Sequence, residues 1–343
     1  MRRRSFLAAS AAALTAPAWA ALGDPAFLAA AREPDGRYAL FGLTAFGQIA
    51  FRVPLPARGH AAAAHPTRAE AVAFARRPGT FALVLDCATG QTRHRLEPPA
   101  GHHFYGHGTY LDGGNTLVTT ENAYEIGDGR LGLWDATDDH RRIGDIPSGG
   151  IGPHEVIRLP GTDTLAVANG GIRTHPATGR EKLNLDTMRP NLTYIRDGHV
   201  IERVDLPDPK LSIRHLTARA DGTVAMGLQS QSDPSAHVPL VATHRQSQAP
   251  KLRGADLAPS FQGYVGSIAW SGDGTRLAAT GPRGNRAAIW TGASVDLLHR
   301  TDICGVAPAG RNVAFTDGTG GVLTEAGAAK HSVAWDNHLV ALS

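Results

Sequence analysis

Histidine recurs in front of a short apolar run at five places in this 343-residue sequence. It holds the same position in "RGHAAAA", "YGHGTYL", "GPHEVI", "IRHLTA" and "DNHLVAL". These residues are His60, His107, His154, His215 and His338. Imidazole is a leading ligand for zinc, copper and iron. The five side chains can make one metal site only if the fold brings distant segments together.

The surrounding segments form a repeat that would do this. Six copies read as strand, Gly- or Pro-marked turn, strand and polar loop, and most are followed by a second hairpin such as "TFALVLDCATGQTRHRLEPP". Four strands per unit, with unit starts mostly 40 to 60 residues apart, is typical of a β-propeller blade. In the two repeats that lack histidine, Ser267 and Cys304 occupy the equivalent position.

The two ends of the sequence predict a seventh blade. The segment "AFLAAAREPDGRYALFGLTAFGQIAFRVPLP" supplies three strands, and "WDNHLVALS" offers the missing innermost strand. We therefore predict an all-β, seven-bladed β-propeller over residues 21–343, closed by the C-terminal strand together with the N-terminal strands. In this interpretation "HSVAW", residues 331–335, is the outer strand of the sixth blade; its use as the innermost strand is the alternative.

In a propeller the innermost strands surround the central axis, and all are entered from the same face. Residues at equivalent strand starts should therefore form a ring at one mouth of the channel. We predict that His60, His107, His154, His215 and His338 are metal ligands there, with Cys304 as an optional one. Alternatively, the histidines form hydrogen bonds that plug the channel, or they bind a carboxylate.

Loops between the second and third strands of each blade should emerge on the same face. We expect their polar side chains to orient the imidazoles or to bind a ligand. Turn-forming residues are common in any loop, so a purely structural use is the alternative. The long loop at residues 170–190 is expected to lie over the ring. The candidates are Glu33, Glu121, Asn122, Asn169, His175, Gln229 and Arg283.

The first twenty residues resemble an export signal. Arg3-Arg4 precede Ser5-Phe6-Leu7 and an Ala/Leu run too short to cross a bilayer, and the stretch ends in "AWA". We expect residues 1–20 to be a twin-arginine signal peptide and the mature chain to be periplasmic, without a transmembrane segment. Without Arg2, Arg3 and Arg4 the chain has 31 basic and 31 acidic residues, so nothing indicates a nucleic-acid partner.

The two cysteines, Cys87 and Cys304, fall in the first and sixth blades. Because a closing seventh blade makes these blades non-adjacent, we predict no disulfide between them.

Many segments carry a resemblance to an uncharacterised family of twin-arginine-exported bacterial β-propellers. The sequence is similar to that family over nearly all of the mature chain, in "ARGH", "FARRPGTFALVLD", "FYGHG", "TTEN", "GIGPHE", "VANGGIRTHP", "LNLDTMRPNL", "SIRHL", "CGVAP" and "WDNHL". Members are typically encoded beside imelysin-type iron-regulated proteins and a di-haem oxidoreductase-like protein. The resemblance implies iron or copper acquisition, with other periplasmic iron-handling proteins as partners.

The sequence also resembles, in general plan, the histidine-ringed copper propeller of nitrous oxide reductase. Ser267 and Cys304 interrupt the ring here, and the accompanying copper-binding domain is absent from this sequence. Three hypotheses follow: a periplasmic protein that binds a transition metal ion or metal chelate, with iron or copper as the metal; a metal-dependent oxidoreductase; or an interaction scaffold whose histidine ring is structural.

Overall fold

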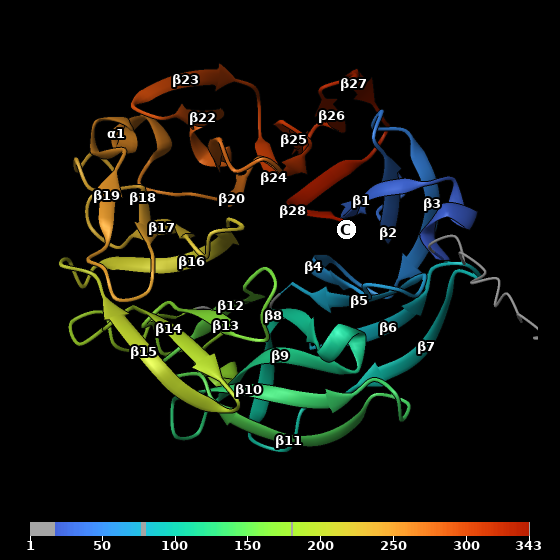
Figure 1. Cartoon of the computed structure of the whole chain (residues 1–343), viewed down its shortest axis with the longest axis horizontal. Coiled ribbons are helices and arrows are strands. Elements are labelled where there is room, and N and C mark those ends of the chain that lie inside the picture. The colour runs from blue at the N-terminus through green and yellow to red at the C-terminus, as the bar shows by residue number, and fades with distance from the viewer. Residues whose placement is uncertain (1–17, 77–79, 180, 343) are drawn as a thin grey trace, which may run out of the picture.

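The chain folds into seven four-stranded antiparallel sheets arranged in a closed ring (Figure 1). The computed structural model describes residues 18–76, 80–179 and 181–342. The first three blades, each given from the channel outwards, consist of β4 (Gly59–Ala64), β5 (Glu70–Ala75), β6 (Ala82–Asp86) and β7 (Gln91–Leu96); β8 (His102–Leu111), β9 (Thr116–Ala123), β10 (Asp128–Asp135) and β11 (Arg141–Pro147); and β12 (Pro153–Arg158), β13 (Leu165–Asn169), β14 (Asn191–Arg196) and β15 (His199–Asp205).

The next three blades repeat this order. They consist of β16 (Leu211–Ala218), β17 (Val224–Ser230), β18 (Val241–His244) and β19 (Lys251–Arg253); β20 (Ser267–Trp270), β21 (Arg276–Gly281), β22 (Arg286–Thr291) and β23 (Ser294–His299); and β24 (Ile303–Ala309), β25 (Asn312–Asp317), β26 (Gly321–Thr324) and β27 (Gly327–Lys330).

The seventh blade joins segments from opposite ends of the chain. Its strands are β28 (Ala334–Ala341), β1 (Pro25–Arg32), β2 (Tyr38–Thr44) and β3 (Ile49–Leu55), in that order from the channel. Antiparallel pairing of β28 with β1 closes the ring, so neither strand presents a free edge there. The predicted seven-bladed architecture and its mode of closure are confirmed.

One strand prediction within this architecture is wrong. Residues 331–335 do not form the outer strand of the sixth blade, because that strand is β27. Ala334 and Trp335 instead begin β28 and pair with Arg32 and Ala31. The indole of Trp335 is buried and lies edge-on to the ring of Phe41, with the centroids 5.4 Å apart. Burial of this aromatic pair favours placing the segment at the channel, as in the alternative interpretation.

The hydrophobic core lies between neighbouring blades. Tyr194 and Leu192 of the third blade, for example, are fully buried against Met226 and Leu228 of the fourth. Since both faces of each blade are covered by a neighbour, the middle strands are almost continuously apolar. This packing makes the ring a rigid frame for the side chains that line its channel.

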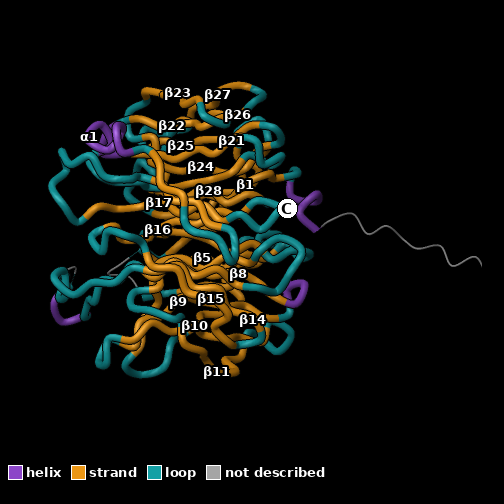
Figure 2. Tube along the Cα trace, turned by 60° about the vertical axis from the view of Figure 1, so that its left-hand side comes forward, coloured by secondary structure: helices purple, strands orange, loops and turns teal. Residues whose placement is uncertain are grey.

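Helical structure is confined to short loops on the two faces of the ring (Figure 2). The elements are η1 (Ala18–Leu22), η2 (Asp112–Gly114), η3 (Pro176–Thr178), η4 (Ala255–Leu257), α1 (Ala258–Phe261) and η5 (Pro282–Gly284). Over the described ranges, no helix has the length and apolar character needed to span a bilayer. Most of the predicted signal peptide, residues 1–17, lies outside the described residues; Trp19, near its end, stacks on Phe51.

Candidate metal centre in the channel

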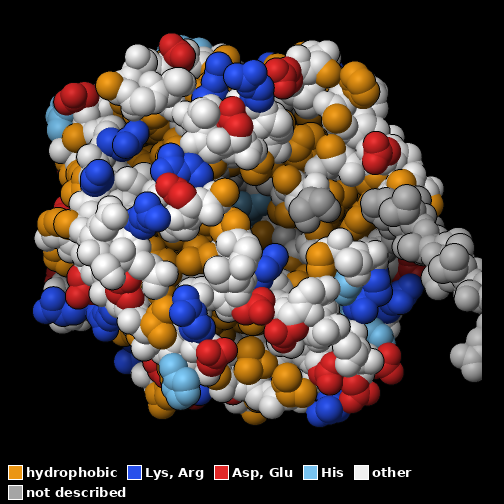
Figure 3. Space-filling model, in the orientation of Figure 1, with side chains coloured by type: hydrophobic (Ala, Val, Ile, Leu, Met, Phe, Trp, Pro, Cys, Tyr) orange, Lys and Arg blue, Asp and Glu red, His pale blue; other side chains and the backbone are white. Residues whose placement is uncertain are grey.

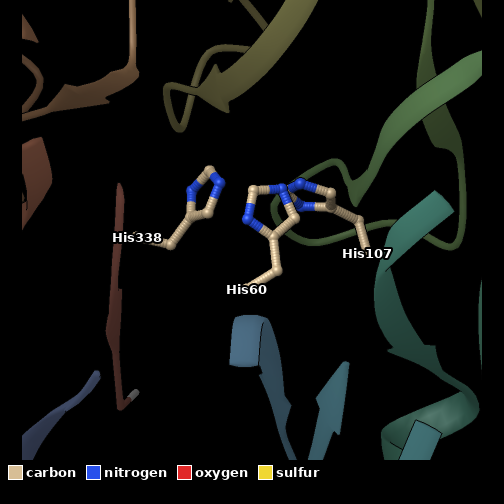
Figure 4. A group of neighbouring side chains, drawn as sticks. All are labelled: His60, His107 and His338. Carbon is tan, nitrogen blue, oxygen red and sulfur yellow. The ribbon is translucent and has the colours of Figure 1, made fainter. Parts of the chain in front are cut away.

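The five predicted histidines converge in the channel of the propeller. His60 lies on β4, His107 on β8, His154 on β12, His215 on β16 and His338 on β28, which are the innermost strands of five successive blades. Figure 4 shows the imidazoles of His60, His107 and His338 pointing toward one another from three separate strands. Residues up to 278 positions apart in the sequence therefore share one space.

The spacing of the rings is close enough for shared ligation. Centroid distances are 4.5 Å for His60–His338, 5.0 Å for His107–His154, 4.9 Å for His154–His215 and 4.8 Å for His215–His338. Two groups of three can each offer nitrogen atoms that lie within 4.8 Å of one another: His60, His107 and His338, and His107, His154 and His215. Because His107 belongs to both, the two groups form one continuous donor set.

Local irregularities in the inner strands accompany the histidines. The register with the second strand shifts between Gly59 and Ala62 in β4, Phe104 and Gly108 in β8, Pro153 and Glu155 in β12, and Ile213 and His215 in β16. In β28 the shift spans Trp335 to Leu339. Such bulges redirect side chains out of the regular alternation of a strand. Each histidine lies within or at the edge of one.

Gly106 is required by the bulge in β8. Its φ is +104°, and a Cβ atom there would lie 2.8 Å from Cδ2 of the His60 imidazole. A side chain at this position would therefore strain the backbone and displace the neighbouring ring. The glycine lets the strand that carries His107 approach the imidazole of His60.

A carboxylate links two of the imidazoles. Oε1 of Glu155 lies 3.6 Å from Nδ1 of His107, and its Oε2 lies 3.3 Å from Nδ1 of His215. The backbone N–H of Leu216 donates a 2.9 Å hydrogen bond to the same Oε2 and fixes the carboxylate. A carboxylate at Nδ1 favours the tautomer that leaves Nε2 free, an arrangement commonly found behind metal-bound histidines.

A second carboxylate lies behind His60. Oδ1 of Asp336 is 3.7 Å from Nδ1 of His60 and accepts a 2.8 Å hydrogen bond from Arg76. Nε of Arg58 donates to the other oxygen. Burial opposes ionisation of Asp336, but the His60 interaction and the two arginines outweigh it, so the pKa of this carboxyl lies below its usual value.

Burial keeps four of the imidazoles, those of His60, His107, His154 and His338, uncharged at neutral pH. It lowers the pKa of His60 to about 4, despite the nearby Asp336. Burial is also the main cause that lowers the pKa values of His107, His154 and His338 well below 6.5, with neighbouring imidazoles and cations adding to the effect. Neutral imidazole is the form that binds a metal ion, so no proton has to be removed at neutral pH.

Several buried nitrogens of these rings have no hydrogen-bond partner among the described residues. They are Nδ1 of His154 and Nε2 of His107 and His338, whereas Nδ1 of His60 faces Asp336 at 3.7 Å. Buried polar atoms are nearly always paired, because an unpaired one costs about 1–3 kcal/mol. Three such atoms in one set of facing rings therefore fit a ligand that accepts lone pairs, as a metal ion does.

Two cavities lie on either side of the imidazoles. One, of about 280 Å³, is lined by His107, His215 and His338 and by apolar residues of the inner strands such as Val156 and Ile268. The other, of about 170 Å³, is lined by His60, His154 and His215 and by polar loop residues. Figure 3 shows histidine atoms deep in the central opening on one face. The imidazoles thus lie between the two cavities and line both of them.

Comparison with known families finds a match over most of the chain. Residues 53–342 match the family described as "Protein of unknown function (DUF1513)". The chain belongs to this family. No curated protein is significantly similar to it in sequence.

Solved structures similar to this family member share its fold. Hydrazine synthase from Kuenenia stuttgartiensis aligns with a TM-score of 0.60 at 13% identity, over 91% of this chain and 96% of the other. The Cps50 (Swd1) β-propeller domain of Myceliophthora thermophila aligns with a TM-score of 0.53 at 15% identity, over 77% of this chain and 79% of the other. At these identities the likeness concerns the propeller architecture alone.

The two repeats without histidine contribute no donor to these groups. Sγ of Cys304 lies 3.3 Å from the backbone oxygen of Asp336 and 3.6 Å from that of Thr316, in the apolar seam between the sixth and seventh blades. Burial raises the pKa of this thiol, which keeps it protonated. The optional ligand thus lies apart from the two groups of imidazoles. Cys87 is also a buried free thiol.

Five of the loop candidates do not contact the ring imidazoles in any interaction that we observe. The carboxylate of Glu121 accepts from Arg142 at 2.7 Å and faces His102; Asn122 donates to the Thr174 carbonyl at 3.1 Å. Asn169 bonds Ser148, Asn191 and Thr193, and His175 accepts from the N–H of Ala177. Glu33 pairs with Arg52. Their polar atoms are taken up within or between blades, so they stabilise the frame.

Gln229 and Arg283 do line the smaller cavity beside the histidines. The residues that sequence reasoning missed are Glu155 and Asp336, which face the imidazoles, and Arg76, Arg214 and Tyr264, which line the same cavity. Arg76 directly follows the second strand of its blade, so the loop rule that selected Gln229 could have found it. Glu155 and Asp336 occupy non-equivalent positions of the repeat, so it gives no signal for them.

Proposed function

We propose that this protein is a periplasmic metal-binding propeller that takes part in iron or copper handling. The ion would be held by imidazoles of His60, His107, His154, His215 and His338. The observation that carries the proposal is the set of facing, buried imidazole nitrogens without hydrogen-bond partners. A structural plug would be expected to pair these atoms with one another or with the backbone.

The donor chemistry supports a transition metal. Imidazole suits copper, iron, zinc and nickel, and copper(II) generally has the highest affinity among the divalent first-row ions. In a tetrahedral site with metal–nitrogen bonds of 2.0–2.1 Å the donors are about 3.3 Å apart. The observed nitrogens, no more than 4.8 Å apart, can reach this spacing by small side-chain rotations.

The test is metal analysis of protein exported by its native route, followed by titration of the metal-free protein with copper(II) and, without oxygen, iron(II). We expect stoichiometric metal in the wild type. His107→Ala removes the residue common to both donor groups and should weaken binding by more than about 100-fold. The matched control is His199→Ala, an exposed histidine on the outer strand β15.

Absence of copper or iron after native export, together with no binding on titration, would overturn the proposal. Equal metal affinity in the His107→Ala and His199→Ala variants would also contradict it. In either case the scaffold hypothesis, with a structural ring, would be favoured.

A metal-dependent oxidoreductase is the second candidate, because cavities reach the imidazoles from both sides. A small molecule entering either one could meet a bound ion directly. Reduction of a redox dye that requires the metal, and that is lost in His107→Ala, would support catalysis. Bound metal without turnover would instead favour storage or delivery.

A further inference from the structure

Three arginines line the smaller cavity beside the imidazoles, and none of the described residues that line it is acidic. Arg76 follows β5, Arg214 belongs to β16 and Arg283 to η5, so three different blades each contribute a guanidinium. Tyr105, Tyr264, Gln229 and Asn337 complete the polar lining beside the histidines. The side chains that line this cavity therefore favour a negatively charged occupant.

The three arginines of the cavity differ in the partners that hold them. Arg76 is paired with Asp336. Nε of Arg214 donates to Gln229 at 3.1 Å. The guanidinium of Arg283 lies over the ring of Tyr264, 4.5 Å from its centroid, and has no ion pair among the described residues.

A fourth cation reaches the same region from the loop at residues 170–190. Partial loss of hydration is the main cause that lowers the pKa of Lys182, and the charges of Arg214 and Arg283 add to it; its Nζ donates a hydrogen bond to Oε1 of Gln231. Repulsion among these three cations would be relieved by an anion placed between them.

We propose that this cavity binds a small organic carboxylate, held by Arg214 and Arg283 and directed at the histidine ring. Arginine presents two parallel N–H donors that match the two oxygens of a carboxylate. A second carboxylate group of the same ligand would reach the metal ion, a contact that rests on the proposed function. The cavity volume of about 170 Å³ is below the 300–1,000 Å³ usual for drug-sized ligands, so the anion is small.

The experiment is equilibrium dialysis of the wild type with labelled oxalate, in metal-free and copper-loaded forms, with phosphate in a parallel arm. Arg283→Ala is the test variant, since Arg283 is exposed and its loss breaks no observed ion pair. Arg311→Ala, with a side chain 87% exposed, is the control. We expect oxalate affinity to fall about 10- to 100-fold in Arg283→Ala and to stay unchanged in Arg311→Ala.

Metal content is measured on the same samples, so that the two proposals can fail separately. Oxalate binding that depends on Arg283 supports the carboxylate pocket. Tighter oxalate binding in the copper-loaded form also supports the direct contact with the metal. Equal oxalate binding with and without copper overturns that contact. The carboxylate pocket is overturned if copper binds normally but oxalate does not bind at millimolar concentration. It is also overturned if both arginine variants bind oxalate with equal affinity. In both cases the proposed metal site is unaffected. Phosphate bound as tightly as oxalate overturns the preference for a carboxylate.

Discussion

The blades with a channel histidine differ from the two without one in how the inner strand is bent. In the fifth blade, β20 pairs with β21 in unbroken register from Ser267 to Trp270, and no bulge is present. In the sixth, β24 does shift register around Cys304, but the thiol turns to backbone oxygens in the seam with the seventh blade. A bulge therefore accompanies every channel histidine, but a bulge alone does not deliver a donor to the channel.

The two blades without a channel histidine separate β16, which carries His215, from β28, which carries His338. A Cβ at Gly305 would lie 2.9 Å from the backbone nitrogen of Leu339, so β28 approaches β24 very closely there. This close approach brings His338 to the channel beside His215, although two blades separate their strands.

The largest expected effect is a loss of stability in acid, caused by the blades that carry a channel histidine. His60 has a pKa of about 4 when folded and about 6.5 when unfolded, so the unfolded chain binds more protons between these values. Stability is complete above pH 6.5 and falls as the pH drops toward 4, by roughly 3 kcal/mol for this residue. Urea unfolding of metal-free protein at pH 7, 5.5 and 4 measures the loss.

His60→Gln serves as the control for that measurement, since glutamine does not titrate. The pH dependence of its unfolding free energy should be flatter than that of the wild type. Identical pH dependence in both proteins would show that His60 has the same pKa in the folded and unfolded states, and would contradict the prediction.

The next effect concerns Glu155, which supports two of the imidazoles. Glu155→Gln keeps the size of the side chain but removes its charge, and should weaken metal binding about 10- to 100-fold. Competition titration with a chelator of known affinity measures the change. Glu125→Gln, at a 72% exposed side chain facing His175, is the control and should bind metal normally. A normal affinity for Glu155→Gln would remove the orienting role of this carboxylate.

The smallest effect is expected at Cys304. Cys304→Ala should leave metal affinity unchanged, because Sγ faces backbone oxygens and not the imidazoles. Loss of a buried sulfur in the apolar seam should lower the free energy of unfolding by about 1 kcal/mol. Denaturant unfolding and metal titration of the same sample measure both. A marked loss of metal affinity would indicate that Cys304 is a ligand. The sixth blade would then contribute a donor, as the histidine-bearing blades do.

The sequence was sufficient for the architecture and for the imidazoles because both follow from a repeat. Once the strands are aligned, His60, His107, His154, His215 and His338 must lie on innermost strands, which surround the axis. The segment at residues 331–335 was misplaced because a short apolar stretch fits either an outer or an inner strand. Only the pairing of Trp335 with β1 and its packing on Phe41 of the same blade decide between them.

The surroundings of the imidazoles could not be predicted in the same way. Whether Glu155 faces the channel depends on the shift of register at Pro153–Glu155. Nothing in the amino-acid sequence of β12 indicates that bulge. The side chains of Glu121 and Asn169 follow the same strand-end rule as Gln229, yet interactions with neighbouring strands hold them elsewhere. Loop position thus predicts the face of the molecule but not the direction of a side chain.

The closure of the ring by β28 sets the order in which the donors become available during synthesis. His338 is the last of the five imidazoles to be translated, and it reaches the channel only when its strand docks onto β1, which was made first. A nascent chain therefore holds an incomplete set of donors until the first and last strands meet. Capture of an ion by all five imidazoles would thus report that the toroid has finished folding.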